Sequence, residues 1–536
     1  MFGRTGKLLA GALSVAACGT SRTDAAKENS RTPHSVPEGV VDAGNVSDAA
    51  QSREMADGGS DKRAKWSLPL VIGTCDEARK KEGTVRFTIA HFNDMQARYS
   101  DRIDGRSRYA YVAGYLRQLK KEVPETLVLD AGDDYEKGSV AEVRSNGETT
   151  RAMVQALPID VRTIGNHDFA YGEEAVLRDV RESAHPVLAA NVRHTKLSAA
   201  EQPFLPFVRA DVGCVRVGIV GVVTQNYAAD DTPTKEPFDG VFEQDIRYVD
   251  AIEREIAAHR QEVDVMIALT HIGLFVDAAT ATNPRTRGLD FVFGGHTEEL
   301  LRWPALVRRK DGSRVSIMQA GHFARNVGRA DFVVNLRDKT ARIEKYRVID
   351  VDASLPHADD VAELVDHLEH DAAPTAQTVI AHARSEIPQG RSMAALTTRA
   401  AMSAWGAHAV VIGRDLFWEG LPSGPITLQR LYDSVFVQRQ PSGTQGFSSL
   451  WTVELTGAEL QALRVGFRGS SYEATWPPKI DPAARYRLVL DKRALTYPHA
   501  LFGPRAKLPE AKLGGEMIDL LETYARARTA AGLPIE

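Results

Sequence analysis

Five short apolar segments between residues 87 and 293 are each followed at once by side chains that can bind a cation. The segments are Phe87–His91, Leu127–Leu129, Val161–Ile164, Val265–Leu269 and Phe291–Phe293. Helical spacing of apolar residues covers Tyr109–Lys121, Glu148–Leu157, Glu173–Glu182 and Gln244–His259. Strands that alternate with helices predict a layered α/β domain, in which ligands bind beyond the carboxyl ends of the strands.

The polar clusters after these strands contain carboxylates, amides and imidazoles. They are Asn93-Asp94-Met95-Gln96, Gly132-Asp133-Asp134, Gly165-Asn166-His167-Asp168, Thr270-His271 and Gly294-Gly295-His296-Thr297-Glu298. Each cluster alone is a weak signal, because a lone Gly-Asp pair is usually a turn. Five strand ends can meet at one crevice, so their joint occurrence predicts a site for two cations roughly 3.5–4 Å apart.

The chain has 536 residues, which is too long for one ordinary domain. We expect a first domain over 84–350, a connecting helix within 351–375 and a second domain over 376–536. Within the first domain, Ser316–Gln319, Ala330–Val334 and Ala341–Ile349 are predicted to form a closing antiparallel set. The second domain shows shorter apolar runs that alternate with helical patterns, which predicts a smaller α+β unit.

The N-terminus has the pattern of an export signal. Arg4 and Lys7 precede the apolar run Leu8–Ala17, which is too short to span a bilayer. A run of small residues that ends at Cys18 resembles the lipobox of bacterial lipoproteins, so residues 1–18 are predicted to be a signal with lipidation at Cys18. The alternative is an ordinary signal peptide with an incidental cysteine.

Residues 19–83 are interpreted as a disordered tether, because they are mostly rich in Ser, Asp, Ala, Gly and Arg. This arrangement predicts a protein that is exported and held at the cell envelope by its lipid. Cys75 and Cys214 could pair in an oxidising compartment or remain two buried thiols. The net charge of −5 gives no reason to expect a nucleic-acid polymer as a partner. No feature of the sequence predicts an oligomeric state.

Taken in order, the five polar clusters resemble the calcineurin-like metallophosphoesterase superfamily. The nearest branch is the 5'-nucleotidase family, with its UDP-sugar hydrolases and 2',3'-cyclic-nucleotide phosphodiesterases. Further matching segments are Ala189-Ala190-Asn191-Val192, Gln319-Ala320-Gly321, Val327-Gly328-Arg329 and Leu455-Thr456-Gly457-Ala458-Glu459-Leu460. The resemblance implies a four-layer α/β/β/α metallophosphoesterase domain, followed by a smaller α+β domain like the C-terminal domain of 5'-nucleotidases.

The resemblance also implies a ligand set for two divalent metal ions. One ion would be held by Asp94, Gln96, Asp133 and Glu298. The other would be held by Asp133, Asn166, His271 and His296, so that Asp133 bridges the pair. A hydroxide between the metals would attack the phosphorus of a small phosphoester, and His167 would face the substrate as the catalytic histidine. The substrate expected is a nucleotide or a nucleotide-like compound.

Three positions depart from the family pattern. Gln96 stands where the family usually has His, and Glu298 stands where it commonly has Gln, Asn or His. The first ion would then have only oxygen ligands, so we expect Mn²⁺ or a mixed pair, with Mg²⁺, Zn²⁺, Fe or Ca²⁺ as alternatives. Ala170 replaces the Asp that usually orients the catalytic histidine, so another group orients His167 or its role is weakened. Asp168 is expected to point elsewhere.

In the second domain the family's nucleotide motifs are altered. The candidate substrate-binding residues are Asn191 in the first domain and Arg391, Arg414, Tyr497 and Phe502 in the second. Phe417 and Trp418 are further candidates for stacking on a ring. Core packing is the alternative for each aromatic. A non-catalytic binding lipoprotein that has kept the fold is the alternative for the whole protein.

Three more histidines lie outside the predicted ligand set. His91 falls inside the first strand and is predicted to be buried and hydrogen-bonded. His185 and His322 are expected to be structural or exposed, although His322 could line the crevice because it follows a strand.

Overall fold

The computed structural model describes residues 69–536 except for 137, 225–240, 246, 437–447 and 505. The predicted first domain contains two large β-sheets. The six-stranded sheet has the order β17 (Thr340–Asp350), β16 (Asn326–Asn335), β2 (Thr84–Phe92), β5 (Thr126–Asp130), β6 (Val161–Thr163) and β7 (Val187–Leu188). From β2 to β7 the neighbours are parallel, whereas β16 is antiparallel to both β2 and β17.

The seven-stranded sheet supplies the other half of this domain. Its order is β1 (Leu70–Ile72), β9 (Phe207–Val212), β10 (Val215–Val223), β12 (Val265–His271), β13 (Phe291–Gly294), β15 (Arg314–Met318) and β14 (Ala305–Arg308). The prediction that Ser316–Gln319 joins the closing antiparallel set was wrong, because β15 lies parallel to β13 in this second sheet. A short apolar run does not encode which of two stacked sheets it enters.

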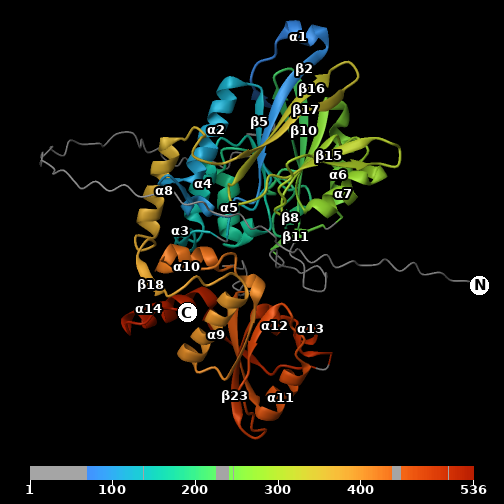
Figure 1. Cartoon of the computed structure of the whole chain (residues 1–536). Helices are drawn as coiled ribbons and strands as arrows, with labels where there is room; N and C mark the ends of the chain where they lie inside the picture. Colours follow the sequence, from blue (N-terminus) through green and yellow to red (C-terminus); the bar gives the residue numbers. More distant parts are fainter. Residues whose placement is uncertain (1–68, 137, 225–240, 246, 437–447, 505) are drawn as a thin grey trace, which may run out of the picture. The chain divides into compact units, whose positions relative to one another are not determined.

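The two sheets pack face to face through their apolar side chains. In this core the ring of Phe87 stacks on Phe332 at 4.8 Å, and Phe291 meets the same ring edge-on at 4.9 Å. The outer face of the six-stranded sheet is covered by α2 (Arg108–Glu122) and α4 (Glu148–Ala156). The outer face of the other sheet is covered by α6 (Tyr248–His259) and α7 (Leu274–Thr282) (Figure 1). The expected four layers are therefore confirmed.

The central strands read as nearly continuous apolar runs because both of their faces are covered. His91 is the polar exception in β2. It is fully buried, and its Nε2 lies 3.1 Å from the hydroxyl of Tyr346. The prediction of a buried, hydrogen-bonded histidine is confirmed.

The expected tether over residues 19–83 was drawn too long. Leu70–Ile72 forms β1, which pairs in parallel with β9, and Glu77–Glu82 forms helix α1. A disulfide joins Cys75 to Cys214 in the turn between β9 and β10, across 139 positions of sequence. The even composition of this stretch hid a three-residue strand, since a run this short gives almost no periodic signal. Cys18 and the rest of residues 1–68 lie outside the described residues.

A helix and a third sheet follow the first domain. Helix α8 (Asp359–Ala372) comes first. The five-stranded sheet has the order β22 (Tyr472–Thr475), β19 (Ala409–Gly413), β23 (Arg485–Asp491), β21 (Ser449–Thr456) and β24 (Ala511–Glu516). One face packs on α9 (Arg391–Trp405) and α14 (Met517–Ala530). The other packs on α11 (Gly457–Gly466), α12 (Lys492–Thr496) and α13 (Pro498–Phe502).

The start of α11 shows how sequence sets local structure here. The Thr456 side chain accepts a hydrogen bond from the Glu459 amide, and the Glu459 carboxylate accepts one from the Thr456 amide. This capping box satisfies two backbone donors that a helix start would otherwise leave unpaired. Shorter elements complete the described chain: β3 (Arg102–Ile103), β4 (Arg106–Ser107), α3 (Val140–Arg144), α5 (Glu173–Glu182), β8 (Val192–His194), β11 (Phe242–Gln244), β18 (Val379–Ala383), β20 (Gly424–Thr427) and α10 (Leu428–Ser434).

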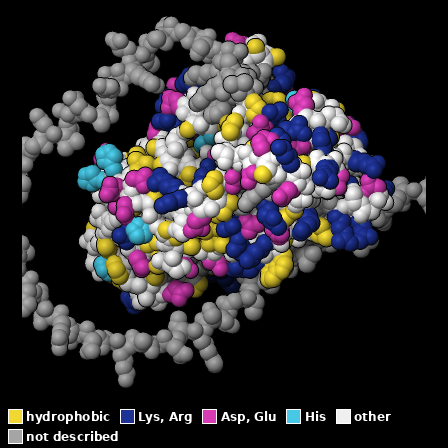
Figure 2. All heavy atoms as spheres, turned by 90° about the horizontal axis from the view of Figure 1, so that it is seen from above, with side chains coloured by type: hydrophobic (Ala, Val, Ile, Leu, Met, Phe, Trp, Pro, Cys, Tyr) yellow, Lys and Arg dark blue, Asp and Glu magenta, His cyan; other side chains and the backbone are white. Residues whose placement is uncertain are grey.

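Acidic and basic side chains are interspersed over the face of the molecule shown in Figure 2. None of the helices in the described ranges is both long enough and apolar enough to cross a bilayer.

Candidate metal centre

The loops after β2 and β5 are joined through their backbones. The amide of Asp94 donates to the carbonyl of Gly132 at 2.8 Å, and the amide of Gln96 donates to the carbonyl of Asp133 at 2.9 Å. The next loop joins them, because the His167 amide donates to Asp133 Oδ1 at 2.8 Å. Polar clusters that are far apart in sequence therefore meet at one edge of the domain.

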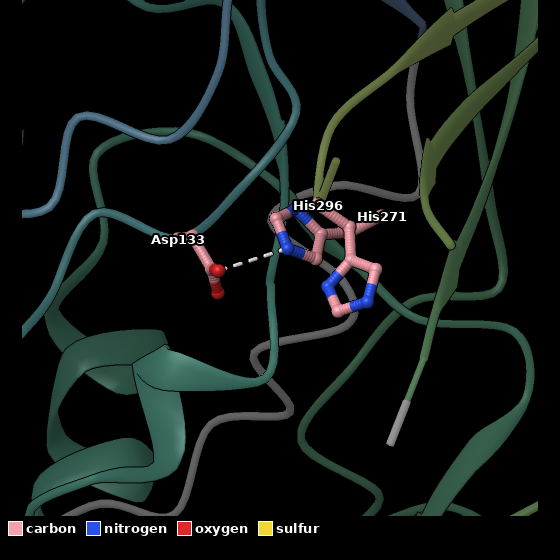
Figure 3. A group of neighbouring side chains, drawn as sticks. All are labelled: Asp133, His271 and His296. Atoms are coloured by element: carbon pink, nitrogen blue, oxygen red, sulfur yellow. Dashed lines mark ion pairs between the residues drawn. The ribbon is translucent and has the colours of Figure 1, made fainter. Parts of the chain in front are cut away.

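Three of the predicted ligands form a compact group. Asp133, His271 and His296 each offer a ligand atom, and these atoms all lie within 4.8 Å of one another. Figure 3 shows the two imidazole rings beside the Asp133 carboxylate, which is 3.0 Å from His271 Nε2. The rings are 5.4 Å apart between centroids.

The imidazole of His271 is held with one nitrogen toward this group. Its Nδ1 donates to the carbonyl of Ala131 at 2.7 Å, which leaves Nε2 facing Asp133. Such a second bond is how proteins fix the tautomer of a metal-binding histidine. Burial lowers the pKa of His271, but the neighbouring Asp133 and Asp94 carboxylates outweigh burial and raise it.

The predicted oxygen ligands lie beside this group. Asp94 is fully buried, and its Oδ2 accepts hydrogen bonds from Asn93 Nδ2 at 2.6 Å and from the His296 amide at 3.1 Å. Gln96 Nε2 donates to Glu298 Oε1 at 3.0 Å. Asp94 Oδ1 and Gln96 Oε1 are buried and have no hydrogen-bond partner among the described residues.

This crowding of buried oxygens disfavours the ionised form of Asp94. Burial raises the pKa of Asp94, and the nearby carboxylates of Asp133 and Glu298 raise it further, while His271 lowers it. Buried polar atoms without partners cost free energy. A divalent ion would satisfy both the unpaired oxygens and the excess negative charge, so the residues present fit a metal centre.

The remaining predicted ligand, Asn166, meets His296. Asn166 Oδ1 lies 3.0 Å from His296 Nδ1, so the two groups share a hydrogen bond. All seven predicted ligand residues are thus connected to the Asp133 group by hydrogen bonds or close contacts. The structure brings together side chains that span more than two hundred positions of sequence.

Most of these residues have an unusual backbone. Positive φ angles occur at Asp94 (54°), Gln96 (49°), Asp133 (61°), His296 (78°) and Glu298 (57°). Residues other than glycine rarely adopt this left-handed region, and such strain clusters at functional sites. The strain is consistent with loops that are shaped by what they bind rather than by local preference.

Asp168 binds the backbone of the loop that carries Asp133. Its carboxylate accepts hydrogen bonds from the amides of Gly165 at 2.7 Å, Asp134 at 2.8 Å, Asp133 at 3.2 Å and Tyr135 at 3.3 Å. Burial raises its pKa, as does the adjacent Asp134 carboxylate. Asp168 thus points away from the ligand group, as expected, and the amides it binds include that of Asp133.

His167 faces the ligand group with one ring nitrogen. Its Nε2 lies 3.9 Å from Asp133 Oδ2, while its Nδ1 forms a short hydrogen bond with the carboxylate of Glu136. Ala170, where a carboxylate is usual, is buried and apolar. Glu136 was not singled out in the sequence. The sequence did place a carboxylate with no assigned role three residues after Asp133, in a loop at the end of a strand, and this could have pointed to Glu136.

The predicted substrate residues are not all brought together. Asn191 is buried, and its side chain binds both the amide (3.0 Å) and the carbonyl (2.8 Å) of Val223 at the end of β10. Arg391 and Arg414 both reach Glu473 Oε2, each at 3.1 Å. Tyr497 is half-buried at the end of α12. Phe502 packs in the core 6.0 Å from Phe467, which does not fit the expected stacking surface.

Aromatic rings from the later part of the chain do reach the site. The ring of Phe436 lies 6.2 Å from that of His167 and 5.2 Å from that of Trp418. Trp418 in turn lies 6.0 Å from Phe323. Sequence reasoning singled out Trp418 but missed Phe436, because nothing near position 436 marks its proximity to residue 167. Phe417 is instead buried in the core.

The two remaining histidines differ in position. His185 is buried, and His322 lies half-buried with its Nδ1 3.5 Å from Glu298 Oε2. His322 therefore borders the oxygen ligands, as its place after a strand suggested.

Comparison with known proteins shows which families the chain is similar to. Residues 87–299 match the model of the calcineurin-like phosphoesterase family. A snake venom 5'-nucleotidase from Gloydius brevicauda is 29% identical over 294 residues, 49% of this chain and 48% of that protein. The 5'-nucleotidase of Homo sapiens is 28% identical over 295 residues, 50% of this chain and 49% of that protein. The chain spans about half the length of the curated relatives it matches.

A solved structure extends the similarity in fold. The 5'-nucleotidase precursor from Thermus thermophilus superposes with a TM-score of 0.65 at 19% identity, over 83% of this chain and 96% of that one. At this identity the similarity shows the fold alone. It covers the third sheet as well as the two stacked sheets, since the matched share exceeds the first domain.

Proposed function

We propose that this chain is a metal-dependent hydrolase of phosphoric esters, because residues 87–299 match the model of the calcineurin-like phosphoesterase family. The observation that carries the proposal is the convergence of Asp133, His271 and His296 at the strand ends of that domain. Related proteins of the comparison are named 5'-nucleotidases, so nucleotides are the first substrates to test.

We assign two cation positions to the seven residues. Asp94, Gln96, Asp133 and Glu298 would hold one ion, and Asp133, Asn166, His271 and His296 would hold the other. When bound, the cations would act as Lewis acids on a phosphoryl group and lower the pKa of a water toward ~7, which supplies the nucleophile. With its ring protonated, His167 would donate from Nε2, the nitrogen that lies 3.9 Å from Asp133 Oδ2, to an oxygen of the substrate.

The oxygen-only set of the first position favours Mn²⁺ over Zn²⁺. The variant Gln96→His adds an imidazole at a buried position whose amide oxygen has no hydrogen-bond partner in the part of the chain that the structure describes. We expect it to shift the preference toward Zn²⁺, as measured by metal content after dialysis against equal concentrations of both ions. Unchanged Mn²⁺ preference in this variant would argue that Gln96 is not a ligand.

Substrate choice is proposed to rest partly on the rings beside His167. Phe436 lies beside the proposed catalytic histidine and Trp418 lies beside Phe436, and the faces of such half-buried rings suit a flat ring. A nucleotide-like ester that carries a base is therefore favoured over an aliphatic phosphate. A panel of nucleoside monophosphates, cyclic nucleotides and sugar phosphates on the purified full-length chain tests this order.

The central experiment removes the bridging carboxylate. In Asp133→Asn we expect bound metal and hydrolysis to fall together, with activity lowered by more than about 100-fold. The matched control is Asp264→Asn, which removes a buried carboxylate that pairs with Arg216 at 2.7 Å away from the ligand group. Full activity of Asp133→Asn would refute the metal assignment.

The same assay addresses the alternative of a binding protein that kept the fold. That alternative predicts bound metal without turnover of either a chromogenic phosphomonoester or a phosphodiester. Turnover of one of them by the wild-type chain excludes it.

We also propose that the chain is exported and anchored by a lipid on Cys18. The support is the sequence pattern before that cysteine, together with a disulfide typical of oxidising compartments. The variant Cys18→Ser should leave the membrane fraction in a cell fractionation. Retention in that fraction would contradict the anchor.

A further inference from the structure

The loop after the bridging carboxylate contains a second buried carboxylate with no assigned task. Glu136 lies three residues after Asp133, and its carboxylate forms a short hydrogen bond with Nδ1 of His167. We propose that Glu136 is the positioning residue of His167, an inference that rests on the proposed function. It does not touch the substrate, and it acts by fixing the orientation and the tautomer of the ring.

The two ends of the His167 ring have different surroundings. Nδ1 meets the Glu136 carboxylate, and Nε2 lies 3.9 Å from Asp133 Oδ2. An ionised Glu136 carboxylate only accepts hydrogen bonds, so it would keep a proton on Nδ1 and leave Nε2, on the side of the ligand group, as the nitrogen that gains or loses a proton. The doubly protonated ring can then donate from Nε2 to a substrate oxygen. A hydrogen bond at one nitrogen decides what the other can do.

Glu136 is itself held before any substrate arrives. It is 3% exposed, its φ of 64° is left-handed, and its amide donates to Glu142 Oε1 at 2.8 Å. Glu142 belongs to α3 and is fully buried. A Cβ added at Gly138 would lie 2.3 Å from the carbonyl oxygen of Ala97, so this loop packs closely on the Gln96 loop. The carboxylate is therefore preorganised.

Other candidates for this task are occupied or absent. The Asp168 carboxylate is bound by four backbone amides, and Ala170 has no polar side chain. Glu136 reaches the same ring from another loop. The geometry thus gives His167 a partner that spacing along the sequence did not predict.

Loss of the partner should affect turnover more than substrate binding. With Glu136→Gln the amide can donate or accept, so it no longer dictates which nitrogen carries the proton. We expect kcat to fall about 10–100-fold with little change in KM, as for other residues that orient a working group. Glu136→Asp keeps the charge and should recover part of the loss.

A double-mutant cycle separates positioning from general damage. If Glu136 acts only through His167, the pair Glu136→Gln/His167→Ala should be no slower than His167→Ala alone. The control Asp264→Asn should leave kcat unchanged. Additive losses in the double variant would overturn the proposal. So would loss of bound Mn²⁺ in Glu136→Gln, because Glu136 is not a proposed ligand.

An independent measurement does not need hydrolysis. In the full-length protein labelled with ¹⁵N-histidine and loaded with Mg²⁺, the His167 signals are assigned by their absence in His167→Ala. We expect a proton fixed on Nδ1 in the wild type and a mixed population in Glu136→Gln. If the proton distribution over the two His167 nitrogens is the same in Glu136→Gln as in the wild type, Glu136 does not position the ring. The proposal that the chain hydrolyses phosphoric esters would be unaffected by that result. A changed ring state without any hydrolysis would instead refute the proposed function.

Discussion

At the scale of single residues, the site requires glycine at position 165, because the Asp133 loop packs against its Cα too closely for any side chain. A Cβ built on Gly165 would lie 2.0 Å from Asp133 Oδ1 and 2.6 Å from its backbone nitrogen. Those contacts are impossible without movement of the proposed bridging carboxylate. Glycine is thus required at this position by the space around it.

We predict that Gly165→Ala lowers both metal affinity and kcat, each by about 10–100-fold, because it displaces Asp133. Isothermal titration with Mn²⁺ and steady-state kinetics provide the measurements. Gly312→Ala is the control for backbone strain alone, since its φ of 87° disfavours a side chain while no described atom lies within 4 Å of the new Cβ. Equal behaviour of the two variants would show that Asp133 is not held where the geometry places it.

The convergence of the proposed ligand residues could be predicted from sequence, whereas the residues that contact them could not. Asp94, Asp133 and Asn166 each follow an apolar strand, so topology alone brings them to one edge. Glu136 reaches His167 through a loop with a left-handed backbone, and Phe436 comes from more than 250 positions away. Loop conformation and long-range docking leave no periodic trace in a sequence.

At the scale of elements, β2 carries a buried histidine whose ionisation opposes folding. Burial lowers the pKa of His91 from 6.5 to about 3. Between these values the unfolded chain binds a proton that the folded chain does not. His91 should therefore cost about 1.4 kcal/mol of stability for each pH unit below 6.5, down to about pH 3.

We expect His91→Leu to remove about one proton from the pH dependence of unfolding across that range. Urea titrations from pH 7 to pH 4 with a chelator present measure this slope without a contribution from metal release. His367→Leu is the control, because that side chain is exposed. An unchanged slope in His91→Leu would mean that the buried ring is already protonated in the folded state.

The disulfide is a further element-scale contact with a measurable effect. It ties the β1–α1 segment to the turn between β9 and β10 across 139 positions. For a loop of this size the chain-entropy model predicts a stabilisation of about 4–5 kcal/mol at most. The paired variant Cys75→Ser/Cys214→Ser should unfold at lower temperature and keep its kcat when folded. No change in unfolding temperature would show that the bridge adds nothing to stability.

Elements with long apolar runs were predicted well, and short ones were not. The boundaries of α5 (Glu173–Glu182) match the prediction at both ends, and β12 (Val265–His271) begins at the predicted residue. The strand β1 was missed, and β15 was given to the wrong sheet. A strand of three to five residues can pair with many different strands, so tertiary packing rather than the local sequence pattern decides which sheet it joins.

At the scale of the whole molecule, Arg98 links the loop after β2 to residues of the second predicted domain. It follows Gln96 by two positions and is 2% exposed. Its guanidinium forms ion pairs with Asp101 at 3.2 Å, Glu419 at 3.3 Å and Asp433 at 3.5 Å. It also lies 4.7 Å from the centre of the Phe323 ring.

Removal of this charge should be costly. Burial raises the pKa of Asp433 to about 6, although Arg98 lowers it. In Arg98→Met the Asp433 carboxylate keeps its burial and loses a partner, which destabilises by about 3–5 kcal/mol. We predict this loss in guanidinium titrations, and partial recovery in Arg98→Met/Asp433→Asn. Arg86→Met is the control, because its pair with Glu344 is largely exposed. If Arg98→Met lowers the free energy of unfolding no more than Arg86→Met does, the buried ion pairs of Arg98 do not stabilise the protein.

The bridge between Cys75 and Cys214 has a practical consequence for anyone who makes this protein. Its two sulfurs stay joined only where the surroundings do not reduce them. A batch produced in a bacterial cytoplasm would carry two thiols instead, and the segment before β2 would be held to the seven-stranded sheet by the β1–β9 pairing alone. Material secreted or refolded in air is therefore the appropriate sample for every measurement of stability.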